Sequence, residues 1–165
     1  MEIVKAGPAQ LVEVAEITRT TIAAVYPHFY PRGVVEFFLN WHKDEKILAD
    51  IRAGEVFLLL DGGRAVGTVT LHEEKLTRLY VLPNCQGKGY GRALLDYGEE
   101  TVGRAQGKIV VEASLPAKGL YLRRGYRETG FFTEEAYGDV LCWDVMEKRW
   151  TPEDDQQAAV PAARG

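Results

Sequence analysis

A short glycine-rich segment with basic and phenolic side chains offers the clearest chemistry in this chain. In Gln86-Gly87-Lys88-Gly89-Tyr90-Gly91-Arg92, the glycines alternate with larger residues, directly after an apolar run ending at Pro83 and directly before an Ala/Leu stretch. Glycines let successive backbone N–H groups turn toward one point, and the start of the following helix directs its unpaired N–H groups and positive dipole end there. The segment therefore predicts a phosphate-binding site.

Spacing separates this segment from two other phosphate-binding motifs. A P-loop requires Gly-Lys-Ser/Thr after a glycine five residues upstream, and no such run is present. A dinucleotide fingerprint fits Gly87 and Gly89, but Arg92 holds the place of its third glycine, and about eighty residues precede it instead of an early βαβ unit. On the loop alone, a glycine-rich connection that binds nothing stays open.

Two motifs in the right order resemble the GNAT superfamily of acyl-CoA dependent N-acetyltransferases. Gln86, Gly89 and Gly91 match the Gln/Arg-x-x-Gly-x-Gly/Ala signature of that family, and residues 79–83 resemble its lead-in. Residues 117–126 resemble the Ala-x-x-x-Tyr-x-x-x-Gly-aromatic stretch that carries the family's tyrosine. The resemblance covers about residues 1–148.

The resemblance implies acetyl-CoA as the cofactor and attack of an amine on its thioester. In this family the fourth and fifth strands splay apart, and these correspond to residues 76–82 and 109–113 here. Main-chain groups at the end of the fourth strand, in Tyr80, Val81 and Leu82, would pair with the pantetheine arm, and the loop amides would bind the pyrophosphate. The implied cofactor contacts are Tyr80, Val81, Leu82, Gln86, Gly87, Lys88, Gly89, Tyr90, Gly91, Arg92, Ser114 and Tyr121. Ser114 replaces the asparagine common in the family, so its contact with the cofactor arm would have a shorter reach.

Tyr121 and Glu74 are the catalytic candidates. A phenol with an ordinary pKa of about 10 stays protonated at neutral pH and can donate a proton to the departing CoA thiolate. The amine must itself lose a proton before it attacks, and Glu74 lies near the position where family members often place an acidic residue. Two plainer interpretations stay open: Tyr121 packs in a helix face, and residues 73–75 form a solvated hairpin tip.

Substrate selection is expected in an aromatic loop between two helical patterns. Tyr26, His28, Phe29 and Tyr30 lie between or beside prolines, and stiff loops of this kind often line ligand sites. An aromatic wall suits an amine with an apolar body or, by cation–π attraction, a polyamine. The same rings could equally fill the core.

Patterning predicts an α+β order in which a meander of strands precedes a β-α-β unit. The resemblance implies that these strands form a mixed, mostly antiparallel twisted sheet flanked by helices on both faces. A short strand at 2–5 precedes helical patterns over 11–25, 33–41 and 47–54, followed by strands at 56–60, 65–71 and 76–82. A helix over 93–102, a strand at 109–113, a helix around 116–124 and strands near 130–132 and 140–147 complete the domain, which we place at 1–150. The polar and Ala/Pro-rich segment 151–165 is expected to be a flexible tail.

Composition excludes several classes of partner. The formal net charge of −4 argues against nucleic acid, although basic residues gather on the two motifs. Cys85 and Cys142 lack the spacing of a disulfide framework or a metal site. Neither a signal peptide nor a membrane-length apolar run is present, so we expect a cytoplasmic protein with no metal and no membrane partner. The strand at 140–147, with Trp143, could support a homodimer.

Three functional hypotheses follow from the sequence. The first is acetyl transfer from acetyl-CoA to a primary amine of a small molecule or peptide, by direct attack in a ternary complex. The second is a module of the same fold that binds acyl-CoA for sensing, without turnover. The third is a different acyl donor or a non-amine acceptor.

Overall fold

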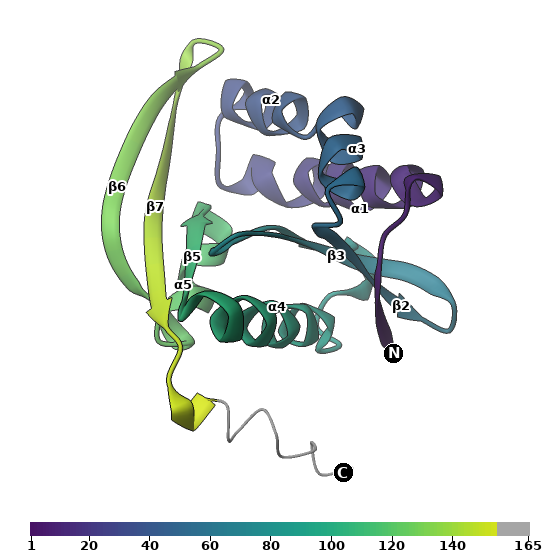
Figure 1. Ribbon diagram of the computed structural model, residues 1–165. Helices are drawn as coiled ribbons and strands as arrows, with labels where there is room; N and C mark the ends of the chain where they lie inside the picture. Colours follow the sequence, from purple (N-terminus) through teal and green to yellow (C-terminus); the bar gives the residue numbers. More distant parts are fainter. Residues whose placement is uncertain (155–165) are drawn as a thin grey trace.

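Seven strands form one sheet in the order β1-β2-β3-β4-β5-β7-β6 (Figure 1). The computed structural model describes residues 1–154, so most of the tail predicted at 151–165 lies outside the described residues. Neighbouring strands are antiparallel except β4 and β5, which are parallel. The strands are β1 Glu2–Lys5, β2 Val56–Asp61, β3 Arg64–His72, β4 Lys75–Val81, β5 Lys108–Ala113, β6 Arg127–Ala136 and β7 Asp139–Arg149. The mixed α+β architecture predicted from the sequence is confirmed.

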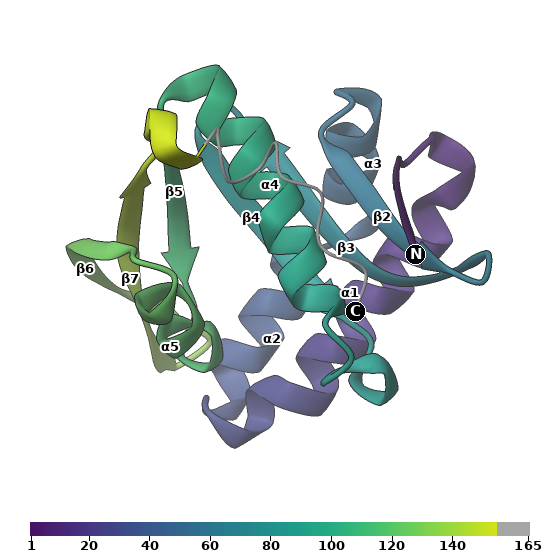
Figure 2. The ribbon, with the colours of Figure 1, turned by 90° about the horizontal axis from the view of Figure 1, so that it is seen from below.

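Helices cover both faces of this sheet, as expected. The first three lie on one face and α4 lies on the other, where it crosses the sheet with α5 beside β5 (Figures 1 and 2). Their bounds are α1 Leu11–Val25, α2 Arg32–Trp41, α3 Asp44–Arg52, α4 Tyr90–Gln106 and α5 Leu115–Arg123. No helix within residues 1–154 is both long enough and apolar enough to span a membrane.

The helices are held to the sheet by apolar stripes with helical spacing. On α1 the buried positions include Val14, Thr18 and Ile22, which recur every four residues and so face the sheet together. On α4 the backbone comes close to the sheet at Gly98, where an added Cβ would lie 2.5 Å from Leu76 Cδ1. This close approach holds the middle of α4 against the first residues of β4.

The two central strands separate soon after they meet. Only Lys75 and Val110 are paired between β4 and β5, and the Val110 N–H donates to the Glu74 carbonyl at 2.8 Å. Further along β4 the register with β3 shifts, and Arg78 takes the left-handed backbone conformation, with φ +46°. A bulge of this kind bends a strand. The splay expected between these strands is confirmed, and the bulge was not predicted.

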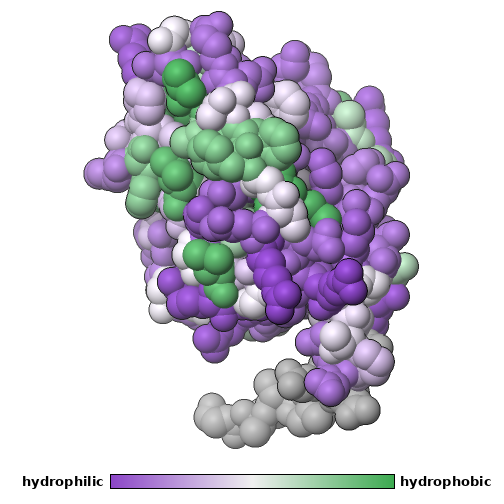
Figure 3. Space-filling view, turned by 90° about the vertical axis from the view of Figure 1, so that its left-hand side faces the viewer, coloured by the Kyte–Doolittle hydropathy of each residue, from purple (hydrophilic) through white to green (hydrophobic). Residues whose placement is uncertain are grey.

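The β6–β7 hairpin extends beyond the sheet edge and contacts both ends of α2. The Gly33 N–H donates to Asp139 Oδ2 at 2.8 Å, and Asn40 Nδ2 donates to Tyr137 Oη at 3.0 Å. Both strands are longer than predicted. Their many polar residues gave no apolar pattern from which the full length of the hydrogen-bonded strand pair could be predicted. Apolar side chains gather over the outer face of this hairpin (Figure 3). Exposed apolar residues of the hairpin include Phe131, Phe132 and Val140.

Candidate functional site

The glycine loop has the backbone shape of an anion cradle. After the 3₁₀ turn Pro83–Cys85, Gly87 and Gly89 have φ of 76° and 86°, and Gly89 is the N-cap of α4. An added Cβ at either glycine would meet no atom within 4 Å. Glycine is therefore required here by backbone conformation and not by crowding. The loop turns into the α4 N-terminus, whose first turn contains no acidic side chain, so its free N–H groups favour an anion.

Side chains around the loop fix its ends and leave its charges free. Gln86 Nε2 donates to the Val81 carbonyl at 3.0 Å, and the Tyr90 hydroxyl donates to Asp61 in the β2–β3 turn. The exposed Lys88 and Arg92 form no ion pair within residues 1–154. The loop is thus anchored at both ends and presents positive charge to solvent.

A basic groove continues from the loop between α4, α5 and β7. It is lined by Arg92, Leu120, Arg123, Arg124 and Lys148. Two of these cations are already neutralised by the buried Glu99: Arg124 Nη2 lies 2.8 Å and Lys148 Nζ lies 3.1 Å from Glu99 Oε2. Arg92 and Arg123 have no ion pair among the described residues, so they are the two groove cations open to an anionic ligand.

The open edge of β4 presents main-chain groups toward the splay. The Leu82 N–H donates to the Val66 carbonyl of β3 at 2.9 Å. Since successive residues of a strand direct their main-chain groups to alternate edges, those of Val81 face the β5 side. The Val81 carbonyl there accepts hydrogen bonds from Gln86 and from Thr21 Oγ1, the latter at 3.1 Å. Of the three predicted main-chain contacts, Val81 is the one on the open edge.

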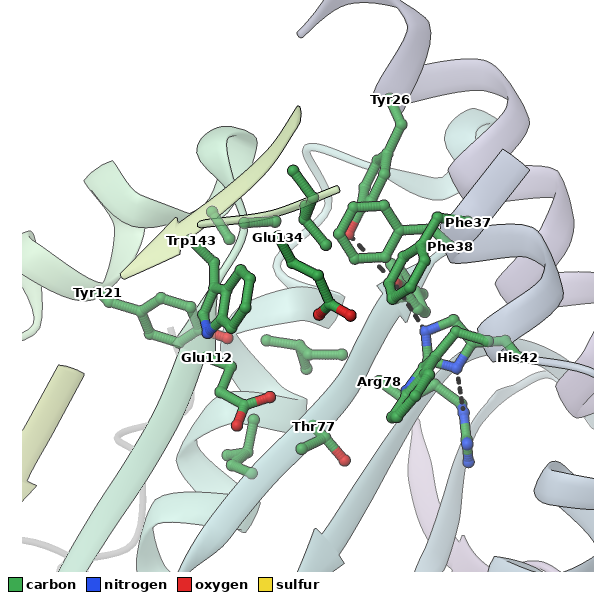
Figure 4. A pocket seen from close by; sticks show the side chains of 17 residues that line it. Tyr26, Phe37, Phe38, His42, Thr77, Arg78, Glu112, Tyr121, Glu134 and Trp143 are labelled. Atoms are coloured by element: carbon green, nitrogen blue, oxygen red, sulfur yellow. Dashed lines mark hydrogen bonds between the residues drawn. The ribbon is translucent and has the colours of Figure 1, made fainter. Parts of the chain in front are cut away.

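A cavity of about 230 Å³ occupies the splay between β4 and β5, and the β6–β7 hairpin, α2 and α5 complete its walls (Figure 4). Many of the lining side chains are aromatic, and a smaller number are polar or charged. The lining residues are Tyr26, Phe37, Phe38, Trp41, His42, Leu76, Thr77, Arg78, Leu79, Tyr80, Glu112, Ser114, Ala117, Tyr121, Glu134, Leu141 and Trp143.

Tyr121 lies in the wall of this cavity on a well-anchored helix. Its ring packs edge-on against Tyr126, with centroids 5.2 Å apart. Burial raises the pKa of the Tyr121 phenol above its ordinary value, so the hydroxyl stays protonated at neutral pH. The start of α5 is fixed by Tyr30, whose hydroxyl oxygen accepts the Leu115 N–H at 2.7 Å. The Arg124–Glu99 pair fixes its end.

A row of buried polar side chains lines the cavity on the side of α2 and β4. Arg78 Nη2 donates to Asp50 Oδ2 at 2.7 Å, and Arg78 Nε donates to His42 Nδ1 at 3.3 Å. The Tyr80 hydroxyl lies 3.5 Å from His42 Nε2 and 3.1 Å from the Tyr26 hydroxyl. Burial, with the nearby Arg78 charge, lowers the pKa of His42 to about 3. The imidazole is therefore neutral at physiological pH, and its proton is on Nε2 because Nδ1 accepts from Arg78.

The residues of the predicted substrate loop lie in three different environments. Tyr26 lines the cavity, and its hydroxyl lies 3.1 Å from that of Tyr80, which is also in the lining. Tyr30 is buried behind the cavity, where it supports α5. His28 and Phe29 are exposed and outside the lining. Their role in acceptor binding stays a prediction.

Glu74 is located at the β3–β4 turn, at the closed end of the splay. Its carboxylate lies 3.4 Å from Lys108 Nζ, and it is not among the residues that line the cavity. The carboxylates in the lining are instead those of Glu112 and Glu134, which the sequence reasoning missed. Glu112 interrupts the apolar run of residues 109–113, and that break in the pattern was a signal for it.

Sequence and structure comparisons agree on one family. Residues 25–149 match the acetyltransferase (GNAT) domain. A GCN5-related N-acetyltransferase from Rhodopseudomonas palustris has 24% identity and a TM-score of 0.81, with 90% of this chain and 94% of that chain covered. PaiA N-acetyltransferase from Thermoplasma acidophilum, solved in complex with coenzyme A, has 20% identity and a TM-score of 0.67, with 90% and 98% covered.

A third solved structure with the same fold is YncA from Salmonella typhimurium, with its cofactor acetyl-CoA. It has 20% identity and a TM-score of 0.63, with 99% of both chains covered. No curated protein matches this chain by sequence.

Proposed function

The chain belongs to the acetyltransferase (GNAT) family, and from that premise we propose that it transfers the acetyl group of acetyl-CoA to a primary amine by direct attack in a ternary complex. One observation carries the proposal. The splay between β4 and β5 holds an aromatic cavity that contains a protonated phenol, and β4 leads from this cavity directly into the glycine loop. A ligand that lies along the β4 edge would therefore have one end at the loop and the other at Tyr121.

The residues present fit coenzyme A. The amides of residues 87–92 would bind the diphosphate, with charge added by Lys88, Arg92 and Arg123. The Val81 N–H on the open strand edge, flanked by Tyr80 and Leu82, would donate to a pantetheine carbonyl, and Ser114 lies beside that path. When bound, acetyl-CoA supplies a thioester carbon that an uncharged amine can attack.

Tyr121 would act as the general acid. As the new C–N bond forms and the C–S bond breaks, the departing sulfur takes up negative charge, and the Tyr121 hydroxyl can give it a proton. The raised pKa keeps this proton on the phenol until that moment. The buried ring and the anchored α5 helix hold the hydroxyl in the cavity wall.

We assign the proton acceptor to Glu112 in place of Glu74, because Glu112 lines the cavity and Glu74 does not. Glu112 Oε1 lies 3.1 Å from Lys75 Nζ, and its carboxylate would accept a proton from the amine. The products are an acetamide and the CoA thiol. Tyr121 and Glu112 regain their starting protonation states by exchange with water.

We also propose that two copies associate through the β6–β7 face and that the enzyme acts in the cytoplasm. The exposed Phe131 and Val140, which lie on the same face of the hairpin, support the first proposal, together with the unpaired edge of β6. Both cysteines are free thiols, which fits a reducing compartment. Light scattering that finds only monomers at high concentration would contradict the dimer.

The proposed transfer is tested by release of free CoA thiol from acetyl-CoA in the presence of a panel of primary amines. Amine-dependent release, with one acetamide formed per thiol, is the expected result. Tight binding of acetyl-CoA with no release for any amine would instead support the sensing module.

A further inference from the structure

The charges in the cavity wall do not balance. Three charged side chains line the cavity: Arg78, Glu112 and Glu134. The Arg78 guanidinium is paired with Asp50 at 2.7 Å, and Glu112 is paired with Lys75 at 3.1 Å. Glu134 is exposed to solvent, and its carboxylate forms no ion pair and accepts no hydrogen bond within residues 1–154. With His42 neutral, the wall therefore has one uncompensated negative charge.

Aromatic rings lie on two sides of this carboxylate. It points from β6 into the cavity between Trp143 and Phe38, and the Glu112 carboxylate is also directed inward (Figure 4). Phe38 packs edge-on against Tyr26, with centroids 4.8 Å apart. Ring faces attract cations, and an ammonium ion next to both a ring and a carboxylate is favoured by both. The wall around Glu134 thus has the chemistry of a site for an organic cation.

The second carboxylate lies too far along the sheet to serve the same cation. In the register of the sheet, Glu112 lies opposite Val145 of β7, and Glu134 lies opposite Leu141 of β7. The two glutamates are therefore separated by one intervening strand and by four residues in register. That corresponds to roughly 10 Å across the sheet and roughly 13 Å along it between Cα atoms. Two separate cationic groups joined by an apolar chain match this arrangement better than one.

We propose that the acceptor is an aliphatic amine with a second, positively charged nitrogen, which Glu134 holds among the aromatic rings while the reacting amine lies at Glu112 and Tyr121. This inference rests on the proposed acetyl transfer and specifies its acceptor. A diamine or longer polyamine with several methylene groups between nitrogens belongs to this class. An aromatic monoamine would contact the rings but leave Glu134 uncompensated.

The test measures binding apart from turnover. Hexamethylenediamine, hexylamine and phenethylamine are titrated calorimetrically into the CoA-bound protein, in the parent and in Glu134→Gln. The control is Glu36→Gln, which removes the same charge from an exposed position on α2 outside the lining. The diamine should bind about tenfold more tightly than hexylamine to the parent and to the control. In Glu134→Gln that preference should disappear.

A charge-reversal variant distinguishes a loss of the Glu134 contact from a general loss of stability. Glu134→Lys should bind aminohexanoate better than hexamethylenediamine, a reversal that unfolding cannot produce. Equal affinity of the parent for the diamine and hexylamine, tighter binding of phenethylamine, or an unchanged preference in Glu134→Gln would each overturn the inference. Diamine binding that depends on Glu134 but leads to no thiol release would overturn the proposed transfer alone.

Discussion

The glycine loop and the aromatic cavity are built in opposite ways. The loop is seven consecutive residues whose function depends on backbone conformation, with Gly87 and Gly89 in the left-handed region and open space where side chains would be. The cavity is assembled from side chains of α2, β4, β5, α5 and the β6–β7 hairpin, which come together only in the folded sheet. A fold can therefore keep one ligand contact local and vary the other contact over many distant positions.

The difference also appears in the electrostatics. The loop is exposed and uses peptide dipoles with unpaired cations such as Lys88 and Arg92. In the cavity wall the buried Arg78 is paired with Asp50, whereas Glu134, at an exposed position, has no ion pair within residues 1–154. We expect substitutions in the loop to change cofactor affinity and substitutions in the cavity to change turnover and acceptor choice.

The largest effect is expected for Tyr121→Phe, which removes the proton donor and keeps the ring. The turnover number kcat should fall about 100-fold, while the dissociation constant for CoA stays unchanged. Tyr126→Phe is the matched control, because Tyr126 packs against Tyr121 but lies outside the cavity lining. Thiol release and calorimetry measure the two quantities. Equal rates in Tyr121→Phe and the parent would remove the general-acid role.

Gly89→Ala tests whether CoA binding depends on the backbone conformation of the glycine loop. Alanine in the left-handed conformation costs about 1–2 kcal/mol, and relaxation of that strain should turn the loop amides away from one another. CoA affinity should fall about tenfold. Gly107→Ala is the control at the opposite end of α4, with φ of 74° and equally open space. It should destabilise the fold by a similar amount and leave CoA affinity unchanged.

His42 gives the buried wall a pH dependence that the exposed loop lacks. Its folded pKa of about 3 is below the unfolded value of about 6.5. Between these values the unfolded chain binds a proton that the folded chain does not, so stability falls as the pH falls. His42 alone should lower the free energy of unfolding by about 1.4 kcal/mol per pH unit in this range. Urea denaturation from pH 7 to pH 4 should show a steeper decline for the parent than for His42→Gln, and parallel curves would contradict this.

Arg123→Gln should have the smallest effect. It removes one free cation from the basic groove, so CoA affinity should fall about threefold at low salt and less at high salt. Arg127→Gln, exposed on β6 and outside the groove, is the control. Similar losses in the two variants would indicate a general charge effect and not a phosphate contact in the groove.

The sequence predicted what depends on consecutive residues. The loop, the strands on both sides of the splay and the helix of Tyr121 follow from local spacing and turn residues, and the structure has each of these elements. The cavity could not be predicted in the same way, because Glu134 and Trp143 belong to strands whose pairing is set by distant partners. Phe38 shows a second reason: its helical spacing indicated packing, and nothing local distinguishes a ring that packs from one that also lines a cavity.

A crystal structure of the protein with coenzyme A tests the central claim most directly, since that claim places two differently built regions at the two ends of one ligand. The diphosphate is expected against the amides of residues 87–92, with the thiol inside the β4–β5 cavity beside the Tyr121 hydroxyl. A diphosphate bound elsewhere, or a thiol directed away from Tyr121, would contradict the account.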